Sequence, residues 1–146
     1  MAGALTPVDI LLVEDDDGDV WFTRDTFDYY KVGNTLHVVR DGVAALRFLR
    51  NEPPYSDAPR PGVILLDLDL PKLDGRAVLA EITADERLRD IPVVILTSSQ
   101  DEADLVRSVI LGASSYITKP VDFDRLVDIV KRLDDFYLTV IRAHTD

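Results

Sequence analysis

The chain has 146 residues, which suits one compact domain and is too short for two. Its 16 basic and 27 acidic residues leave a formal net charge of −11, which argues against a basic surface for nucleic-acid phosphates. The absence of cysteine excludes disulfides, thiolate metal sites and cysteine nucleophiles. No apolar run approaches the ~20 residues of a membrane span. We therefore expect a cytoplasmic protein that binds neither nucleic acid nor membrane.

Short apolar runs rich in Val, Ile and Leu recur along the chain and predict strands that are buried on both faces. A segment with helical spacing of its apolar residues follows each run. This regular alternation predicts an α/β fold, a doubly wound five-stranded parallel sheet with five helices. The predicted strands cover residues 8–13, 35–39, 63–68, 93–97 and 115–117.

The chain shows no internal linker, so we expect one domain over residues 1–146. Its core is predicted over about 8–133, and 134–146 is predicted as a helical C-terminal extension. The most irregular stretch, residues 51–62, holds four of the eight prolines and predicts a stiff surface loop.

Polar residues gather where the predicted strands end, which is the edge at which open α/β sheets bind ligands. Two carboxylates ~4 Å apart repel by about 4 kcal/mol at an effective dielectric of ~20, so a cluster of them invites a hard divalent cation such as Mg²⁺. Carboxylates follow the first and third strands, hydroxyls follow the fourth and an amine follows the fifth: Glu14, Asp15, Asp67, Asp69, Thr97, Ser98 and Lys119.

This combination favours phosphoryl chemistry. Asp67 could act as an oxygen nucleophile that forms an aspartyl phosphate, while Lys119 and Thr97 contact the phosphoryl oxygens. Each residue also has a plain structural interpretation, as a helix cap at Asp67 or Thr97 and as a surface amine at Lys119. Their coincidence at different strand ends is harder to explain by capping alone.

Four motifs give the sequence a wider resemblance: ILLVEDD at 10–16, ILLDLDLPKLDG at 64–75, VILTSS at 94–99 and YITKP at 116–120. From about Val8 to about Leu133 the chain resembles the receiver domain of two-component response regulators, the CheY-like family. The resemblance implies the strand order 2-1-3-4-5 and a receiver that accepts a phosphoryl group from a sensor histidine kinase.

By this resemblance Asp67 is the phosphoacceptor. Mg²⁺, or Mn²⁺ in its place, would be bound by Asp15, Asp67 and the backbone carbonyl of Asp69, with Glu14 acting through a water. Gly75 would have a structural role at the end of its motif.

The resemblance also implies a switch. Thr97 moves toward the phosphoryl group, Tyr116 rotates into the vacated space, and the small Ser98 keeps the approach to the acceptor open. Lys119 pairs with a phosphoryl oxygen, and a cis bond before Pro120 directs it there.

The partner predictions rest on softer features. The proline-bearing loop and the aromatic tail are similar to those of small stand-alone response regulators paired with bacterial phytochromes, which makes a bacteriophytochrome the candidate sensor kinase. The chain stops shortly after the fifth predicted helix, so we expect a stand-alone receiver. An apolar stripe on that helix predicts a homodimer through helix 4, strand 5 and helix 5. The stripe comprises Leu126, Val130, Leu133, Phe136, Tyr137 and Val140.

Two alternatives remain open at this point. One is a binding module of the same fold that works without phosphorylation. The other is a haloacid-dehalogenase-like phosphatase, because Asp67 and Asp69 also resemble the paired aspartates of that family. Pro71 departs from that motif and no segment is spare for a substrate cap. We expect a signalling protein, with self-phosphorylation and slow autodephosphorylation as its only chemistry.

Overall fold

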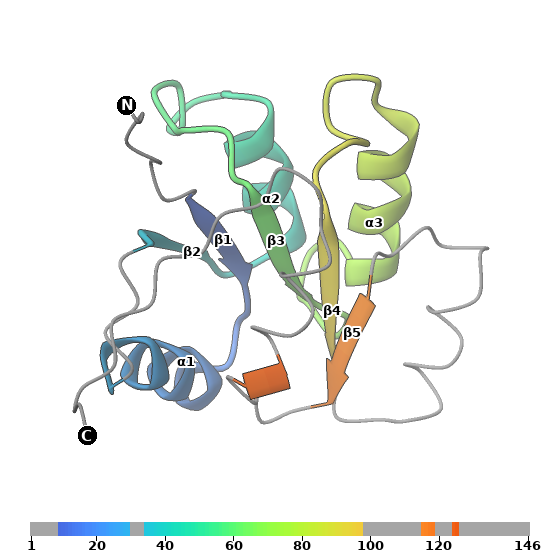
Figure 1. Cartoon of the computed structure of the whole chain (residues 1–146). Helices are drawn as coiled ribbons and strands as arrows, with labels where there is room; N and C mark the ends of the chain where they lie inside the picture. Colours follow the sequence, from blue (N-terminus) through green and yellow to red (C-terminus); the bar gives the residue numbers. More distant parts are fainter. Residues whose placement is uncertain (1–8, 30–33, 98–114, 119–123, 126–146) are drawn as a thin grey trace.

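The apolar runs form the strands of one parallel sheet (Figure 1). The structure, a computed structural model, describes residues 9–29, 34–97, 115–118 and 124–125. The strands are β1 (Ile10–Val13), β2 (Leu36–Val39), β3 (Val63–Asp67), β4 (Val93–Thr97) and β5 (Ser115–Thr118). The helices within these ranges are α1 (Asp17–Tyr29), α2 (Gly42–Leu49) and α3 (Gly75–Ala84).

The strand order is β2-β1-β3-β4-β5, and every neighbouring pair is parallel. The central strands align their carboxyl ends, since Val13 is paired with Val39 on one side and with Leu66 on the other. The expected parallel α/β architecture is confirmed. The helix predicted after β4 lies outside the described residues, and of the helix predicted after β5 only residues 124–125 are described. Both helices stay predictions.

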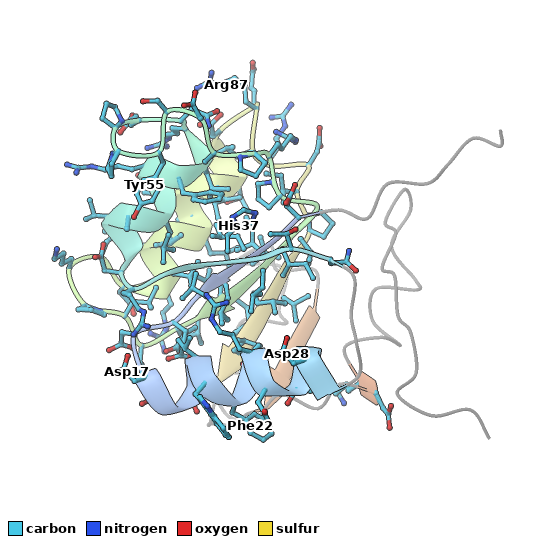
Figure 2. The ribbon with its side chains drawn as sticks, turned by 90° about the vertical axis from the view of Figure 1, so that its left-hand side faces the viewer. Asp17, Phe22, Asp28, His37, Tyr55 and Arg87 are labelled. Carbon is cyan, nitrogen blue, oxygen red and sulfur yellow. The ribbon has the colours of Figure 1, made fainter. Side chains whose placement is uncertain are left out.

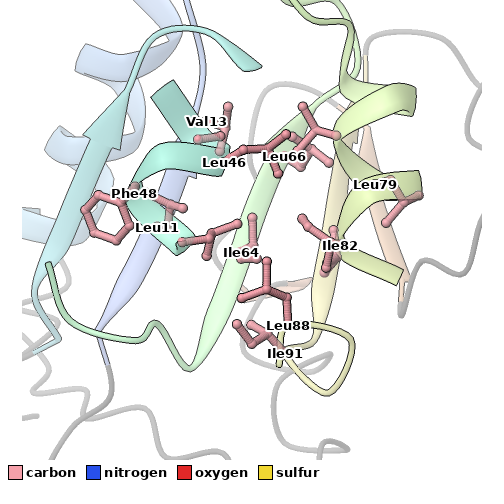
Figure 3. Packing of buried hydrophobic residues seen from close by; sticks show 14 of the residues in the cluster. Leu11, Val13, Leu46, Phe48, Ile64, Leu66, Leu79, Ile82, Leu88 and Ile91 are labelled. Carbon is pink, nitrogen blue, oxygen red and sulfur yellow. The ribbon is translucent and has the colours of Figure 1, made fainter. Parts of the chain in front are cut away.

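The core explains why the strand sequences are apolar throughout. Every residue of β1 and β3 is buried, so both faces of these strands are covered. One face packs against α2 and α3, which lie next to each other (Figures 1 and 3). That layer joins strand residues to helix and loop residues, among them Leu11, Val13, Ile64, Leu66, Leu46, Phe48, Leu79, Ile82, Leu88 and Ile91.

Local signals in the sequence start two of the helices. Asp41 precedes α2 and its side chain accepts a hydrogen bond from the Ala44 N–H at 2.7 Å, which is an N-cap. The helix α1 begins with the acidic Asp17 and Asp19, which suit the positive end of the helix dipole. It lies apart from the α2–α3 pair and buries Val20 (Figures 1 and 2).

The proline-bearing stretch between α2 and β3 contains neither helix nor strand, as predicted. The Asn51 side chain crosses it and donates to the Ala58 carbonyl at 2.7 Å. The Pro53–Pro54 bond is cis, whereas the bond before Pro120 lies outside the described residues. Among the described helices, none has the length and apolar character needed to cross a membrane.

Candidate functional site

The first part of the site lies where β1 ends. The Glu14 N–H donates to the Val39 carbonyl at 3.0 Å, so the chain stays fixed to β2 one residue beyond the strand. The Glu14 side chain is 1% exposed, and its Oε2 accepts from the Asp16 N–H at 3.2 Å. Asp15 is exposed. This strand end therefore presents one buried and one accessible carboxylate.

The second part lies at the end of β3. Asp67 is the last residue of that strand and is only 4% exposed. Its Oδ1 accepts a hydrogen bond from the Asp69 N–H at 3.2 Å. The apolar run before it is buried between neighbouring strands, and this packing holds a carboxylate at a position where charge is costly unless it is compensated.

Gly75 closes the loop that follows Asp67. Its N–H donates to the Leu68 carbonyl at 3.0 Å, so α3 starts directly beside the end of β3. A Cβ atom at Gly75 would overlap the Asp67 carbonyl oxygen and lie 2.7 Å from Leu68 Cα. Only glycine allows this approach without a shift of the backbone.

The two strand ends bring together Glu14, Asp15 and Asp67, which we call the acidic cluster. Each contributes a carboxylate oxygen, and these oxygens all lie within 4.8 Å of one another. Two unit charges at that distance repel by about 3 kcal/mol at an effective dielectric of ~20. The donors are all oxygens, which is the ligand type that Mg²⁺ and Mn²⁺ take in proteins. The acidic cluster thus fits a hard divalent cation.

Two cations in the segments that follow β2 and β3 belong to ion pairs. Arg40, which follows β2, pairs through Nη1 with Oδ1 of Asp17 at the start of α1. Lys72, in the loop between β3 and α3, has its Nζ 3.6 Å from Oδ2 of Asp41. Sequence reasoning did not single out these pairs. The signal available was the N-cap pattern of Asp41 before an apolar helix.

Of the remaining predicted site residues, some have a described backbone and others lie outside the described residues. Thr97 ends β4 and is paired with Thr118 of β5, and Tyr116 is paired with Ile95. These strand ends therefore reach the edge that carries the acidic cluster, but the side chains of Thr97 and Tyr116 are not described. Ser98, Lys119, Pro120 and the predicted dimer residues from Leu126 onward lie outside the described residues.

A different charged group lies where α2 and α3 end, near Arg87, which Figure 2 shows at the end of the molecule away from Asp17. Arg50 Nη2 lies 3.0 Å from Glu81 Oε1, and its Nε lies 3.4 Å from Asp85 Oδ2. The hydrogen bond to Glu81 is the main reason that the pKa of Arg50 is raised. The Arg87 N–H, which donates to Asp85 Oδ1 at 2.9 Å, is the main reason that the pKa of Asp85 is lowered.

These residues line an open concavity between the ends of α2 and α3, with Ala84 and Glu86 completing the wall. Within it, Arg50 pairs with both Glu81 and Asp85. The concavity therefore differs from the acidic cluster in having a guanidinium between two of its carboxylates.

The family profile described as response regulator receiver domain matches residues 10–131. The chain belongs to this family. Its receiver fold and its acidic strand ends are thus those of a two-component signalling protein. The matched region contains all three members of the acidic cluster and every described strand.

Several relatives are similar over almost the whole chain. Response regulator Rcp1 of Synechocystis sp. is 41% identical over 135 residues, which is 92% of each chain. The solved structure of the bacteriophytochrome response regulator RtBRR is 43% identical, covers 90% of this chain and 81% of its own, and has a TM-score of 0.82. The bacteriophytochrome response regulator AtBRR is 40% identical over 91% of this chain and 96% of its own, with a TM-score of 0.84.

A solved form of Rcp1 contains Mn²⁺. It is 40% identical, covers 91% of this chain and 99% of its own, and has a TM-score of 0.73. A relative of this chain therefore binds a divalent cation of the kind that the acidic cluster fits.

Proposed function

We propose that Asp67 accepts a phosphoryl group from the phosphohistidine of a sensor histidine kinase in a reaction that needs Mg²⁺ or Mn²⁺. The observation that carries this proposal is the acidic cluster, in which the strand-end carboxylate of Asp67 lies within 4.8 Å of carboxylate oxygens of Glu14 and Asp15. In the transfer, an oxygen of the Asp67 carboxylate attacks phosphorus and the P–N bond to the kinase imidazole breaks.

The cation would be held by Asp15, by Asp67 and by the backbone carbonyl of Asp69, with Glu14 acting through a water. When bound, it supplies positive charge that offsets both the carboxylates and the incoming phosphoryl oxygens. The Asp69 N–H, which donates to Asp67 Oδ1 at 3.2 Å, orients the acceptor carboxylate. The buried position of Asp67 limits the access of water to the reacting atoms.

The response to phosphorylation is assigned to the neighbouring strand ends. Thr97 is the last residue of β4, and Ser98 comes next in the sequence. We propose that Thr97 donates to a phosphoryl oxygen, while the small Ser98 leaves the approach to Asp67 open. Lys119, directed by a cis bond before Pro120, would neutralise a second phosphoryl oxygen. Tyr116 would rotate as Thr97 moves. The backbone positions of Thr97 and Tyr116 at the same edge are compatible with this switch.

The input partner is a sensor kinase, and the names of RtBRR and AtBRR make a bacteriophytochrome the candidate. The output is a protein contact, since the net charge argues against nucleic acid. We propose a cytoplasmic protein with its receiver core over about residues 8–133, five helices in all and a helical extension over 134–146. The family favours this reading over the phosphatase and over a module that ignores phosphorylation.

We further propose a homodimer through helix 4, strand 5 and helix 5. Its contacts would involve the apolar stripe of the last helix, which comprises Leu126, Val130, Leu133, Phe136, Tyr137 and Val140. Sedimentation at tens of micromolar with and without a phosphoryl mimic tests it. A monomer under both conditions contradicts the dimer.

The phosphoacceptor is tested by incubation with acetyl phosphate and Mg²⁺, followed by intact-mass spectrometry. We expect one phosphoryl adduct on the wild type and none on Asp67→Asn. The exposed Asp90→Asn, far from the acidic cluster in sequence, is the matched control and should accept one. An adduct that persists in Asp67→Asn, or that forms equally after chelation of the metal, contradicts the assignment.

The kinase is tested separately by phosphotransfer profiling. Purified phosphorylated sensor kinases, with bacteriophytochromes among them, are mixed with the protein for short times and the transferred label is measured. Fastest transfer from a bacteriophytochrome supports the partner assignment. Faster transfer from a kinase without a phytochrome module overturns the partner and leaves the phosphoacceptor intact.

A further inference from the structure

The loop between β3 and α3, residues 68–74, contains an unfavourable backbone conformation close to the proposed acceptor. Lys72 has a φ of 67°, in the left-handed region that residues with side chains rarely adopt. The Leu73 N–H donates to the Pro71 carbonyl at 2.7 Å across it, which makes Lys72 the centre of a tight γ-turn. Such a conformation persists only where the surroundings impose it.

The start of α2 is one part of those surroundings. Gly42 lies directly against the loop, because a Cβ atom there would overlap the Leu73 carbonyl oxygen and lie 2.8 Å from Leu73 Cβ. The same atom would lie 2.8 Å from Val78 Cγ2 of α3. The backbone of α2 thus packs on the loop at a distance that no other residue type permits.

Asp41 supplies the other part. Its Oδ1 accepts from the Ala44 N–H at 2.7 Å, which holds the carboxylate at the start of α2. Its Oδ2 lies 3.6 Å from Lys72 Nζ. The Asp41 side chain is 17% exposed, so this ion pair is partly sheltered from solvent on the carboxylate side. One carboxylate therefore both starts α2 and pairs with the residue at the centre of the γ-turn.

The opposite end of the same loop touches the acceptor. The Asp69 N–H donates to Asp67 Oδ1 at 3.2 Å, and the proposed function gives the Asp69 carbonyl to the cation. Between Asp69 and Lys72 there are only two residues. A displacement of the loop at Lys72 will therefore move the peptide groups next to Asp67.

We propose that Asp41, Gly42 and Lys72 form a clamp that positions the β3–α3 loop, and through it Asp69 and the Asp67 carboxylate, for metal binding and phosphoryl transfer. This inference rests on the proposed function. The three are positioning residues, because none of them belongs to the acidic cluster. Their effect passes through the loop backbone, in the way that outer partners of metal sites orient the ligands.

A purely structural role makes a different prediction. An N-cap and a close helix–loop contact would stabilise the fold and leave the metal affinity of the folded protein unchanged. Mn²⁺ affinity, measured by the electron paramagnetic resonance of the free ion, and the initial rate of labelling by acetyl phosphate separate the two roles. Both are measured under conditions where circular dichroism shows each variant to be folded.

The first variant is Gly42→Ala. The added methyl group must displace the Leu73 carbonyl, and we expect Mn²⁺ affinity and labelling rate to fall about 10-fold. Gly18→Ala is the matched control, because its Cβ would meet only side-chain oxygens of Asp16 at 3.6 Å and beyond. The control should keep wild-type affinity and rate.

The second pair of variants covers the case in which Gly42→Ala fails to fold. Asp41→Asn keeps an oxygen that can accept from the Ala44 N–H but loses the charge that pairs with Lys72. Lys72→Gln loses the same pair from the other side. We expect each to weaken Mn²⁺ binding by about 3-fold, the scale of a partly exposed ion pair, and the double variant to be no worse than either alone.

Wild-type affinity and rate in folded Asp41→Asn and Lys72→Gln overturn the clamp, as does additive loss in the double variant. A wild-type protein that neither binds Mn²⁺ nor takes up phosphoryl groups overturns the proposed function itself. The two failures are therefore distinguishable in one set of measurements.

Discussion

The sheet holds carboxylates by different means at the amino ends of its strands, which we call the amino edge, and at their carboxyl ends, which we call the carboxyl edge. At the amino edge, Glu81 and Asp85 flank the guanidinium of Arg50, so side chains of opposite charge hold one another. At the carboxyl edge, the members of the acidic cluster face one another within 4.8 Å. Like charges repel, and the acidic cluster must be held in place by other groups.

Those groups include the backbone. The Glu14 N–H is bonded to the Val39 carbonyl, and the Asp69 N–H is bonded to the Asp67 side chain. Gly75 brings the start of α3 against the end of β3. At the amino ends of the strands a guanidinium lies between the carboxylates. At the carboxyl ends, peptide groups and the Asp41–Lys72 pair outside the acidic cluster hold the chain, and the net charge of the acidic cluster is left for a cation. Substitutions at the two ends of the strands should therefore differ in their effects on metal binding and on stability.

The largest expected effect concerns the cation. Asp15→Asn removes a proposed direct ligand and should weaken Mn²⁺ binding by more than about 100-fold, because changes to outer partners already cost 10–100-fold. It should also raise the free energy of unfolding without metal, since one repulsive charge is lost. Calorimetric titration and urea unfolding measure the two quantities.

The matched control for that prediction is Glu81→Gln at the amino edge. It also removes one carboxylate, but one that pairs with Arg50. Mn²⁺ affinity should stay unchanged and the free energy of unfolding should fall. Equal effects of the two substitutions on metal binding would refute the difference between the edges.

The second prediction tests the backbone contact of the carboxyl edge. Gly75→Ala places a methyl group against the Asp67 carbonyl and should lower the free energy of unfolding by about 2 kcal/mol, the scale of an overpacked core position. Urea unfolding at neutral pH measures it. Gly18→Ala, whose methyl group has space, should leave stability nearly unchanged. Similar losses in both variants would mean that the contact at Gly75 is unimportant.

The third prediction tests the ion pairs of the amino edge. Arg50 is 28% exposed at its side chain, so Arg50→Gln should cost only about 1 kcal/mol of unfolding free energy after allowance for solvent screening. Mn²⁺ affinity should not change. Arg24→Gln, an exposed arginine on α1, serves as the comparison and should have almost no effect on stability.

Sequence reasoning reached the strands and the acidic cluster for the same physical reason. Buried parallel strands need continuous apolar runs, and the residues after them must lie at one edge. The predicted third strand, 63–68, is one residue too long, because Leu68 is fully buried although β3 ends at Asp67. Burial and hydrogen bonding between strands are separate properties, and an apolar run in the sequence indicates only burial.

The clamp and the ion pairs of Arg50 were not predicted. Arg50 and Asp85 are 35 positions apart, and Lys72 meets Asp41 only because two helices start at neighbouring points of the fold. No periodicity encodes such contacts. They follow from packing in three dimensions, and so does the need for glycine at position 42, where an added Cβ atom would overlap the Leu73 carbonyl oxygen.

The smallest expected effect is a pH dependence at Asp85. Its pKa is lowered, chiefly by the Arg87 N–H, so its ionised form contributes stability above pH 3.8, the ordinary value, and loses it as the pH falls through the lower folded value. The difference in unfolding free energy between the wild type and Asp85→Asn should therefore be constant near neutral pH and shrink below pH 3.8. Urea unfolding over a series of pH values measures it.

The same series in an Arg50→Gln background identifies the cause. The Arg87 N–H still donates to Asp85 at 2.9 Å in that background, whereas the weaker contribution of the Arg50 guanidinium is removed. Most of the pH dependence should therefore survive. Its complete loss would show instead that the Arg50 guanidinium is the main cause of the lowered pKa of Asp85 and that the Arg87 peptide group contributes little.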